Sequence, residues 1–161
     1  KVGVRAGFRE RKDVLVKLNA DTDVFAVAFD PSPSAFDPAD TVEEVKRLCA
    51  IAKRKKVWLL DAGFTSLEFV GSSPNRQALF AGQLLRALKE SAGLVEGVTW
   101  WSLRDDDPEA WRRNVWGARE EPEAAPPLPE RAFCGLIDRG GAPKPALREW
   151  VNGVRSLPSP K

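Results

Sequence analysis

Histidine, methionine and tyrosine are all absent from this chain of 161 residues. Without histidine, the chain offers no imidazole base and no Ser-His or Cys-His nucleophile. Acid–base chemistry would therefore fall to carboxylates or lysines. The only cysteines are Cys49 and Cys134. Alone they make no zinc pattern, and two unpaired thiols are favoured over a disulfide. We expect neither a metal site nor a cofactor.

Long apolar runs and a large excess of one charge are missing too. No stretch approaches the length of a membrane span, so no membrane partner is expected. The net charge is +2 with both signs interspersed, which gives no case for a nucleic-acid partner. No signal-peptide pattern is present, but the chain starts at Lys1 rather than Met. The sequence therefore does not indicate a compartment.

What is present is an alternation of strands and helices. Strands are predicted at 2–8, 24–29, 57–64 and 97–103, and helices at 11–19, 41–56, 74–91 and 145–157. Four such units predict an α/β fold with a parallel sheet and right-handed crossovers. This sheet is either an open doubly wound fold or half of an eight-stranded barrel. No Gly-rich phosphate loop follows any strand, which weakens the nucleotide-binding version.

One connection is unusually long. Residues 105–142 separate the fourth strand from the last helix and include a stretch rich in proline and glutamate at 120–130. Loops of this length are usually functional or disordered. In a barrel this loop would lie on the catalytic face, and the alternative is a flexible excursion.

Each of the last three predicted strands has an aspartate at or just after its end: Asp30, Asp61 and Asp105. Since parallel strands end at one edge of the sheet, these carboxylates are predicted to converge on one pocket. Asp30 has an alternative role as the cap of a turn, and Asp105 as part of an exposed turn or helix start. Asp61 follows an apolar strand with no polar turn after it, which favours a functional role. Three aspartates could also hold a divalent metal, a minor alternative without a dedicated spacing.

Two adjacent tryptophans, Trp100 and Trp101, lie in the fourth predicted strand. Side chains alternate across a strand, so one ring faces inward and the other outward. A tryptophan face at the mouth of a pocket is a good platform for a sugar ring. The alternative is that both rings are ordinary core.

Four stretches together resemble a known family. They are "DVFAVAFDP" (23–31), "KKVWLLDAGFTS" (55–66), "LVEGVTWWSLRDDD" (94–107) and "FCGLIDRGGAPKPALREW" (133–150). In order and spacing they are similar to the C-terminal half of clan A glycoside hydrolases, which are retaining (β/α)8-barrel enzymes. The resemblance implies that residues 1–161 form a single (β/α)4 unit whose first strand is the fifth of a barrel.

The resemblance also implies roles for individual residues. Asp61 falls on the catalytic nucleophile, Trp101 on the tryptophan that floors the subsite at the cleaved bond, and Asp105 on a common strand-end aspartate. The departures are an aspartate where the family has glutamate at position 61, and Ala28 and Asp30 where it often has histidine and tyrosine. The acid/base glutamate would come from the fourth strand of the barrel, which lies outside this sequence.

Two hypotheses follow. In the first, the chain belongs to a glycoside hydrolase acting on β-linked polysaccharide or oligosaccharide. Asp61 is then catalytic, and Trp101, Trp100, Asp30 and Asp105 contact the substrate. An N-terminal half-barrel, upstream or on another chain, would supply the acid. In the second, the domain is catalytically silent and binds glycan or serves as a scaffold. Extracellular or cell-envelope placement is implied only by the resemblance.

Overall fold

The computed structural model describes residues 3–110 and 130–157. The strands are β1 (Gly3–Gly7), β2 (Val24–Ala28), β3 (Val57–Ala62) and β4 (Val95–Trp100). The helices are α1 (Lys12–Ala20), α2 (Thr41–Ala52), α3 (Pro74–Glu90) and α5 (Pro145–Arg155), with short 3₁₀ turns at η1 (Pro38–Asp40), η2 (Glu68–Val70) and η3 (Glu130–Phe133). Apart from Glu130, the Pro- and Glu-rich stretch at 120–130 lies outside the described residues.

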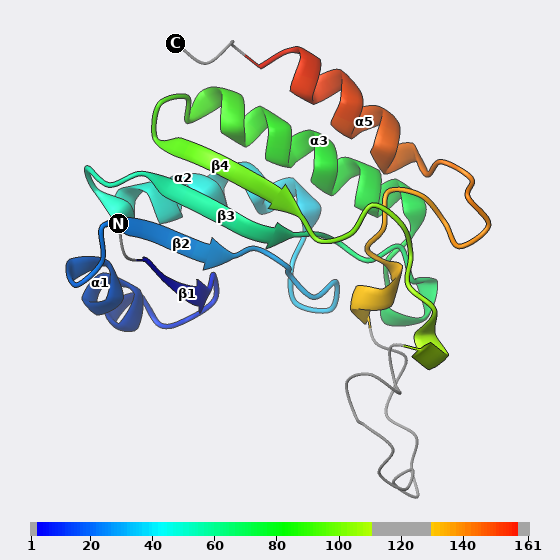
Figure 1. The fold of residues 1–161 in the computed structure, drawn as a ribbon, viewed down its shortest axis with the longest axis horizontal. Coiled ribbons are helices and arrows are strands. Elements are labelled where there is room, and N and C mark those ends of the chain that lie inside the picture. The colour runs from blue at the N-terminus through cyan, green and yellow to red at the C-terminus, as the bar shows by residue number, and fades with distance from the viewer. Residues whose placement is uncertain (1–2, 111–129, 158–161) are drawn as a thin grey trace, which may run out of the picture.

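The four strands form one parallel sheet in the order β1-β2-β3-β4 (Figure 1). In a doubly wound sheet the strand order reverses near the middle, and helices then cover both faces. A strictly sequential order with right-handed crossovers puts every helix on the same face. The sheet is therefore built as the wall of a barrel, one of the two alternatives that the sequence left open.

Local sequence explains where the helices begin and end. The Ser73 hydroxyl accepts the backbone N–H of Arg76 at 3.1 Å and Pro74 takes the first position of α3, as the sequence predicts. The spacing of Thr41 and Glu44 predicts a capping box at the start of α2, and this prediction is wrong. The Thr41 hydroxyl instead donates to the carbonyl of Pro38, the first residue of η1, at 2.8 Å. Helix α2 ends at Ala52, four residues before the predicted end, because Lys53 has φ 60.

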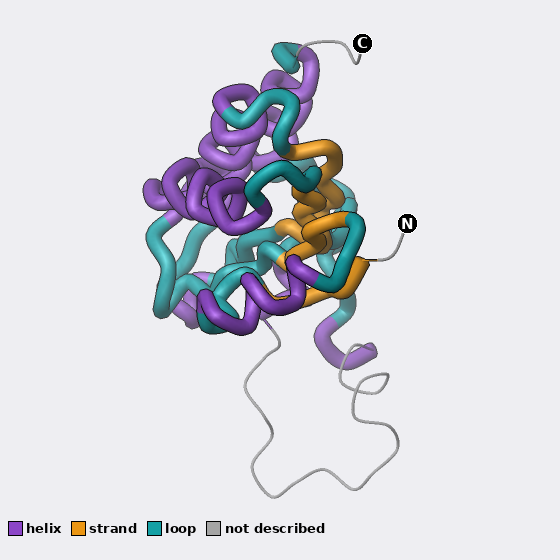
Figure 2. The backbone as a smooth tube through the Cα atoms, turned by 90° about the vertical axis from the view of Figure 1, so that its left-hand side faces the viewer, coloured by secondary structure: helices purple, strands orange, loops and turns teal. Residues whose placement is uncertain are grey.

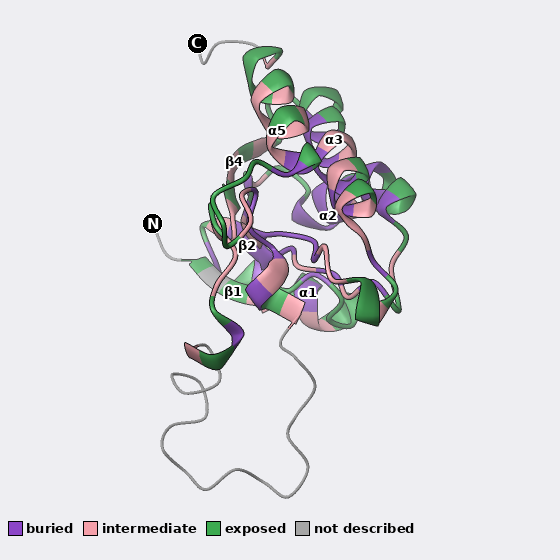
Figure 3. Ribbon diagram, turned by 90° about the vertical axis from the view of Figure 1, so that its right-hand side faces the viewer, coloured by how far each residue is buried: buried purple, intermediate pink, exposed green. Residues whose placement is uncertain are grey.

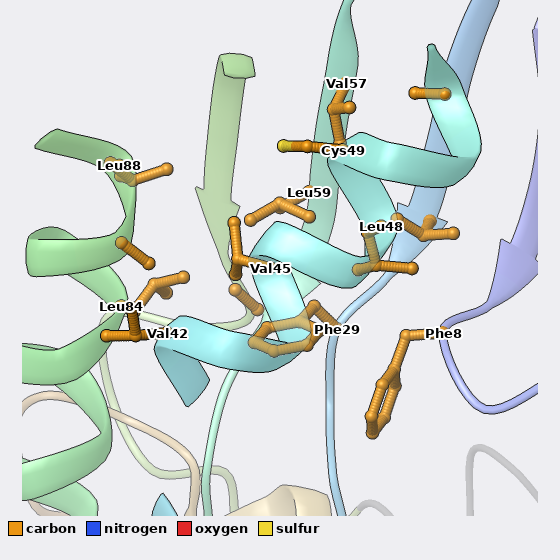
Figure 4. Close-up of a cluster of buried hydrophobic side chains, with 14 of the residues drawn as sticks. Phe8, Phe29, Val42, Val45, Leu48, Cys49, Val57, Leu59, Leu84 and Leu88 are labelled. Atoms are coloured by element: carbon orange, nitrogen blue, oxygen red, sulfur yellow. The ribbon is translucent and has the colours of Figure 1, made fainter. Parts of the chain in front are cut away.

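The core lies between the sheet and its helices. Alternate strand residues such as Val27 and Leu59 point toward Val45 and Leu48 of α2, and all four are fully buried. Figure 4 shows this cluster, with Phe8 and Phe29 at its lower end. Phe80 of α3 stacks on both Phe29 and Phe64, with ring centroids 5.7 and 5.3 Å apart. These contacts fix the helices against one face of the sheet.

The opposite face of the sheet carries no helix among the described residues. Seen from the side, the strands form one layer and the long helices another (Figure 2). Burial is high along α2 and β2 and lower along β4 (Figure 3). Trp58 points to this uncovered face and is 37% exposed, with its indole N–H donating to Glu96 at 2.9 Å. A large aromatic side chain on the inner wall of a barrel-like sheet indicates a surface built to be covered.

A buried ion pair connects the segment that follows β4 to the residue that precedes α5. Lys144 Nζ lies 2.6 Å from Asp105 Oδ1, and the two side chains are 8% and 6% exposed. The same oxygen accepts the backbone N–H of Gly135, while Lys144 also donates to Ser66 Oγ. A Cβ on Gly135 would lie 2.2 Å from the Asp105 nitrogen, so only glycine permits this approach. The pair joins β4, the β3–α3 connection and the start of α5.

Burial raises the pKa of the Asp105 carboxyl, and Lys144 and the Gly135 N–H oppose that rise. A carboxyl whose pKa is higher in the folded than in the unfolded chain binds more protons when folded. Its contribution to stability therefore falls as the pH rises from the ordinary carboxyl pKa through the raised one. Without Lys144 the rise in pKa would be larger, because only the Gly135 N–H would oppose burial.

Lys144→Met is therefore expected to lower the free energy of unfolding by about 3–5 kcal/mol at neutral pH, since it leaves the buried Asp105 charge unpaired. The loss should shrink as the pH falls and Asp105 takes up a proton. Urea unfolding at pH 7 and at pH 4 measures both effects. Lys144→Met combined with Asp105→Asn should recover much of the loss. An equal loss at both pH values would contradict this account.

Candidate active site

Asp61 lies at an irregularity near the end of β3. Strand pairing passes from Leu59–Val98 to Ala62–Trp100, so β3 has one residue more than β4 over this interval. This extra residue is a β-bulge, a feature often found next to active sites. Asp61 has φ 49, and its N–H donates to the Thr99 hydroxyl at 2.9 Å instead of to a strand carbonyl. Aspartate and asparagine are the non-glycine residues that tolerate this backbone region best.

An arginine from β1 holds the Asp61 carboxylate. Arg5 Nη2 lies 2.5 Å from Asp61 Oδ2, and the side chains are 48% and 33% exposed. Arg5 pairs in register with Ala26, so its side chain crosses β2 to reach β3. Ala26 and Ala28 are small enough to leave room for this crossing. The ion pair thus fixes the carboxylate on the uncovered face, at the C-terminal edge of the sheet.

The backbone after β2 continues alongside β3, so Asp30 lies at the same edge as Asp61. Phe29 N–H donates to Leu60 at 2.9 Å, and Gly63 N–H donates to Phe29 at 3.2 Å. Asp30 does not share the arginine of Asp61. It pairs with Arg131 from η3, whose guanidinium carbon lies 4.8 Å from the centre of the Trp101 ring. Asp30, Arg131 and Trp101 therefore form one contiguous group.

Asp105 and Trp100 have different surroundings. Asp105 is held in the buried pair with Lys144, away from solvent. Trp100 packs against Phe80 and Trp150 in the helical layer, and its indole N–H donates to the Cys134 carbonyl at 2.8 Å. The alternation expected for Trp100 and Trp101 thus leaves Trp100 among the helices. The predicted contacts of Trp100 and Asp105 with a substrate remain predictions. The packing of both side chains favours a structural role for each.

The three aspartates share one edge of the sheet, but each is paired with a different cation. Sequence reasoning missed all three of these cations: Arg5, Arg131 and Lys144. Two had a signal. Arg5 is a charge inside a predicted strand, and Lys144 directly precedes a helix start, where the helix dipole disfavours a cation. Arg131 had none, because it follows a long connection and its partners are distant in the sequence.

The chemistry available here is that of an accessible, oriented carboxylate. Asp61 is the one of the three aspartates that is both paired and substantially open to solvent. Within residues 3–110 and 130–157, no group of three or more Cys, Asp or Glu side chains is arranged to hold a metal ion. Cys49 and Cys134 are buried free thiols, and burial raises the pKa of Cys134 to about 12, so this thiol is not a nucleophile at neutral pH. No helix in the described part of the chain is long and apolar enough to span a membrane.

Comparison with known protein families and with curated proteins finds no match. Comparison with solved structures does. The GH5_18 protein from Streptomyces cattleya in complex with GlcNAc matches 87% of this chain with 24% identity and a TM-score of 0.54. A xylanase from Cellvibrio japonicus matches 90% with 16% identity and a TM-score of 0.60. A GH2 beta-galacturonidase from Eisenbergiella tayi matches 88% with 18% identity and a TM-score of 0.60.

This chain covers 33%, 45% and 25% of those three proteins, so it spans less than half of each. At these identities the likeness shows the fold. It confirms the predicted fold class: parallel (β/α) units of the (β/α)8 barrel, which the sequence motifs assign to its C-terminal half. The chain has the architecture of part of a (β/α)8 barrel, with Asp61, Asp30 and Trp101 at the edge where such barrels carry their sites.

Proposed function

We propose that this chain forms the sugar-binding and nucleophile-bearing half of a glycoside hydrolase barrel that acts on β-linked polysaccharide or oligosaccharide. The observation that carries the proposal is Asp61: a solvent-accessible carboxylate on a bulged strand end, held by Arg5, with its backbone N–H donating to the Thr99 hydroxyl. A carboxylate nucleophile must be ionised and fixed in direction. Arg5 supplies the second condition, since it anchors one of the two oxygens of the Asp61 carboxylate.

The second carboxyl group must come from outside this chain. Retaining enzymes need an acid about 5–5.5 Å from the nucleophile and inverting enzymes one about 6.5–9.5 Å away. Asp105 is buried in its pair with Lys144, and Asp30 is 17% exposed and paired with Arg131, so neither carboxyl is open to a leaving group. We therefore assign the acid to the N-terminal half of the barrel, upstream or on another chain. That half would also cover Trp58 on the open sheet face.

A second candidate function is glycan binding without catalysis. It is favoured by the φ of 49 at Asp61, which gives a backbone reason for aspartate where the related barrels carry the longer glutamate. The carboxylate is set back by one methylene, and its ion pair with Arg5 resembles a structural pair as much as a catalytic one. In this case Trp101 and Asp30 would contact the sugar and Asp61 would only support the strand end.

Asp61→Asn is expected to abolish hydrolysis by the complete protein, because the amide is not a nucleophile. Asparagine tolerates the same backbone region, and the Arg5–Asp61 pair is partly exposed, so the free energy of unfolding should change by no more than about 1 kcal/mol. Reducing-sugar release from a panel of β-linked glycans and a thermal melt measure the two quantities.

The matched control is Asp107→Asn. Asp107 is an exposed aspartate beyond the same edge of the sheet, and it pairs with Arg139 at 3.3 Å. The substitution therefore removes the same charge as Asp61→Asn without altering Asp61. The control should keep its turnover. Unchanged turnover in Asp61→Asn would remove Asp61 from the catalytic assignment.

If the protein is catalytically silent, glycan affinity should depend on Trp101 and not on Asp61. Trp101→Ala should then weaken binding by about tenfold or more, which corresponds to 1.4 kcal/mol at least. Asp61→Asn should leave the dissociation constant unchanged. Isothermal titration with the glycans of the panel gives both values. Tight binding that is lost in Asp61→Asn but kept in Trp101→Ala would refute the silent alternative.

A further inference from the structure

Arg131 occupies the positions that a bound sugar would need. Its guanidinium lies over the Trp101 ring, at 4.8 Å from the centroid, and ion-pairs with Asp30. A sugar in the proposed site would stack on that ring and give a hydroxyl to that carboxylate. One side chain thus satisfies both of the groups that the proposed function assigns to the ligand.

The backbone beneath Arg131 is fixed. The Phe133 carbonyl accepts from the Ser66 N–H at 3.1 Å and from Lys144 Nζ at 3.2 Å, and Asp106 N–H donates to the Ala132 carbonyl at 2.9 Å. Ala132 is fully buried. The 3₁₀ turn η3 therefore cannot move away without breaking the buried Asp105–Lys144 cluster, whereas the Arg131 side chain is 43% exposed.

We propose that Arg131 is a side-chain plug of the sugar site, which covers Trp101 in the empty protein and is displaced when a neutral glycan binds. The proposal rests on the proposed function, because it concerns the same site. The ligand exchanges with the plug: a sugar ring replaces the guanidinium on Trp101, and a sugar hydroxyl replaces it at Asp30. Asp30 is only 17% exposed, so it needs such a replacement partner.

The exchange requires the plug to be weak. An exposed guanidinium–aromatic contact and a partly exposed ion pair each contribute little, and salt screens the pair. The plug would then lower glycan affinity by a modest factor and exclude ligands that cannot supply both a flat apolar face and a hydroxyl. Arg131 would thus select among ligands without blocking the site.

Arg131→Ala should bind a neutral β-1,4-linked xylo-oligosaccharide about tenfold more tightly than the unsubstituted complete protein. Arg139→Ala is the matched control, because Arg139 is also exposed and paired with an aspartate, Asp107. Its affinity should not change. In the unsubstituted protein the affinity should rise between about 0.05 and 0.5 M NaCl as the Asp30–Arg131 pair is screened, and in Arg131→Ala it should not.

Acrylamide quenching of Trp101 fluorescence, taken as the difference between variants with Trp101 and with Trp101→Phe, should increase in Arg131→Ala. Binding by Arg131→Ala that is equal to or weaker than that of the unsubstituted protein would overturn the plug and leave the proposed function standing. If Trp101→Ala abolishes binding while Arg131→Ala tightens it, both are supported. No binding of any β-linked glycan by any of these proteins would overturn both.

Discussion

The sequential order of the four parallel strands is the constraint on which the rest of the structure depends. It sends every crossover to the same face of the sheet, and the hydrophobic core with Phe29, Phe64 and Phe80 forms there. The other face is left to Arg5, Trp58 and Asp61. A parallel sheet is normally buried on both faces, so this arrangement calls for a second layer that the described residues do not contain.

At the C-terminal edge of the sheet, three neighbouring aspartates are distinguished by the cation with which each one pairs. Three aspartates end three neighbouring strands, and three cations from different parts of the chain take one each. The most buried pair, Asp105–Lys144, holds the last helix to the sheet. The most exposed pair, Arg5–Asp61, leaves a carboxylate within reach of a ligand. Among residues of the same type, burial thus distinguishes a carboxylate that holds the fold together from one that is open to solvent.

The position of Arg131 depends on the buried ion pair beneath it. The buried Asp105–Lys144 pair supports η3, and η3 presents Arg131 to Trp101 and Asp30. In the proposal made above, this rigid support carries a displaceable side chain that shields the Trp101 ring from water when no ligand is bound. An uncovered tryptophan beside a half-buried carboxylate would be less favourable.

Local patterns account for the alternation of strands and helices, for the apolar run before Asp61 and for the aspartates at or after the ends of three strands, because hydrophobic period and turn residues act locally. The sequence also predicts that the Trp100 and Trp101 side chains point in opposite directions; in the structure Trp100 ends β4 and Trp101 directly follows it. Which cation each carboxylate meets depends on the tertiary fold, since Asp30 and Arg131 are 101 positions apart and no local pattern joins them. The bulge and the positive φ at Asp61 likewise depend on Thr99 of the neighbouring strand.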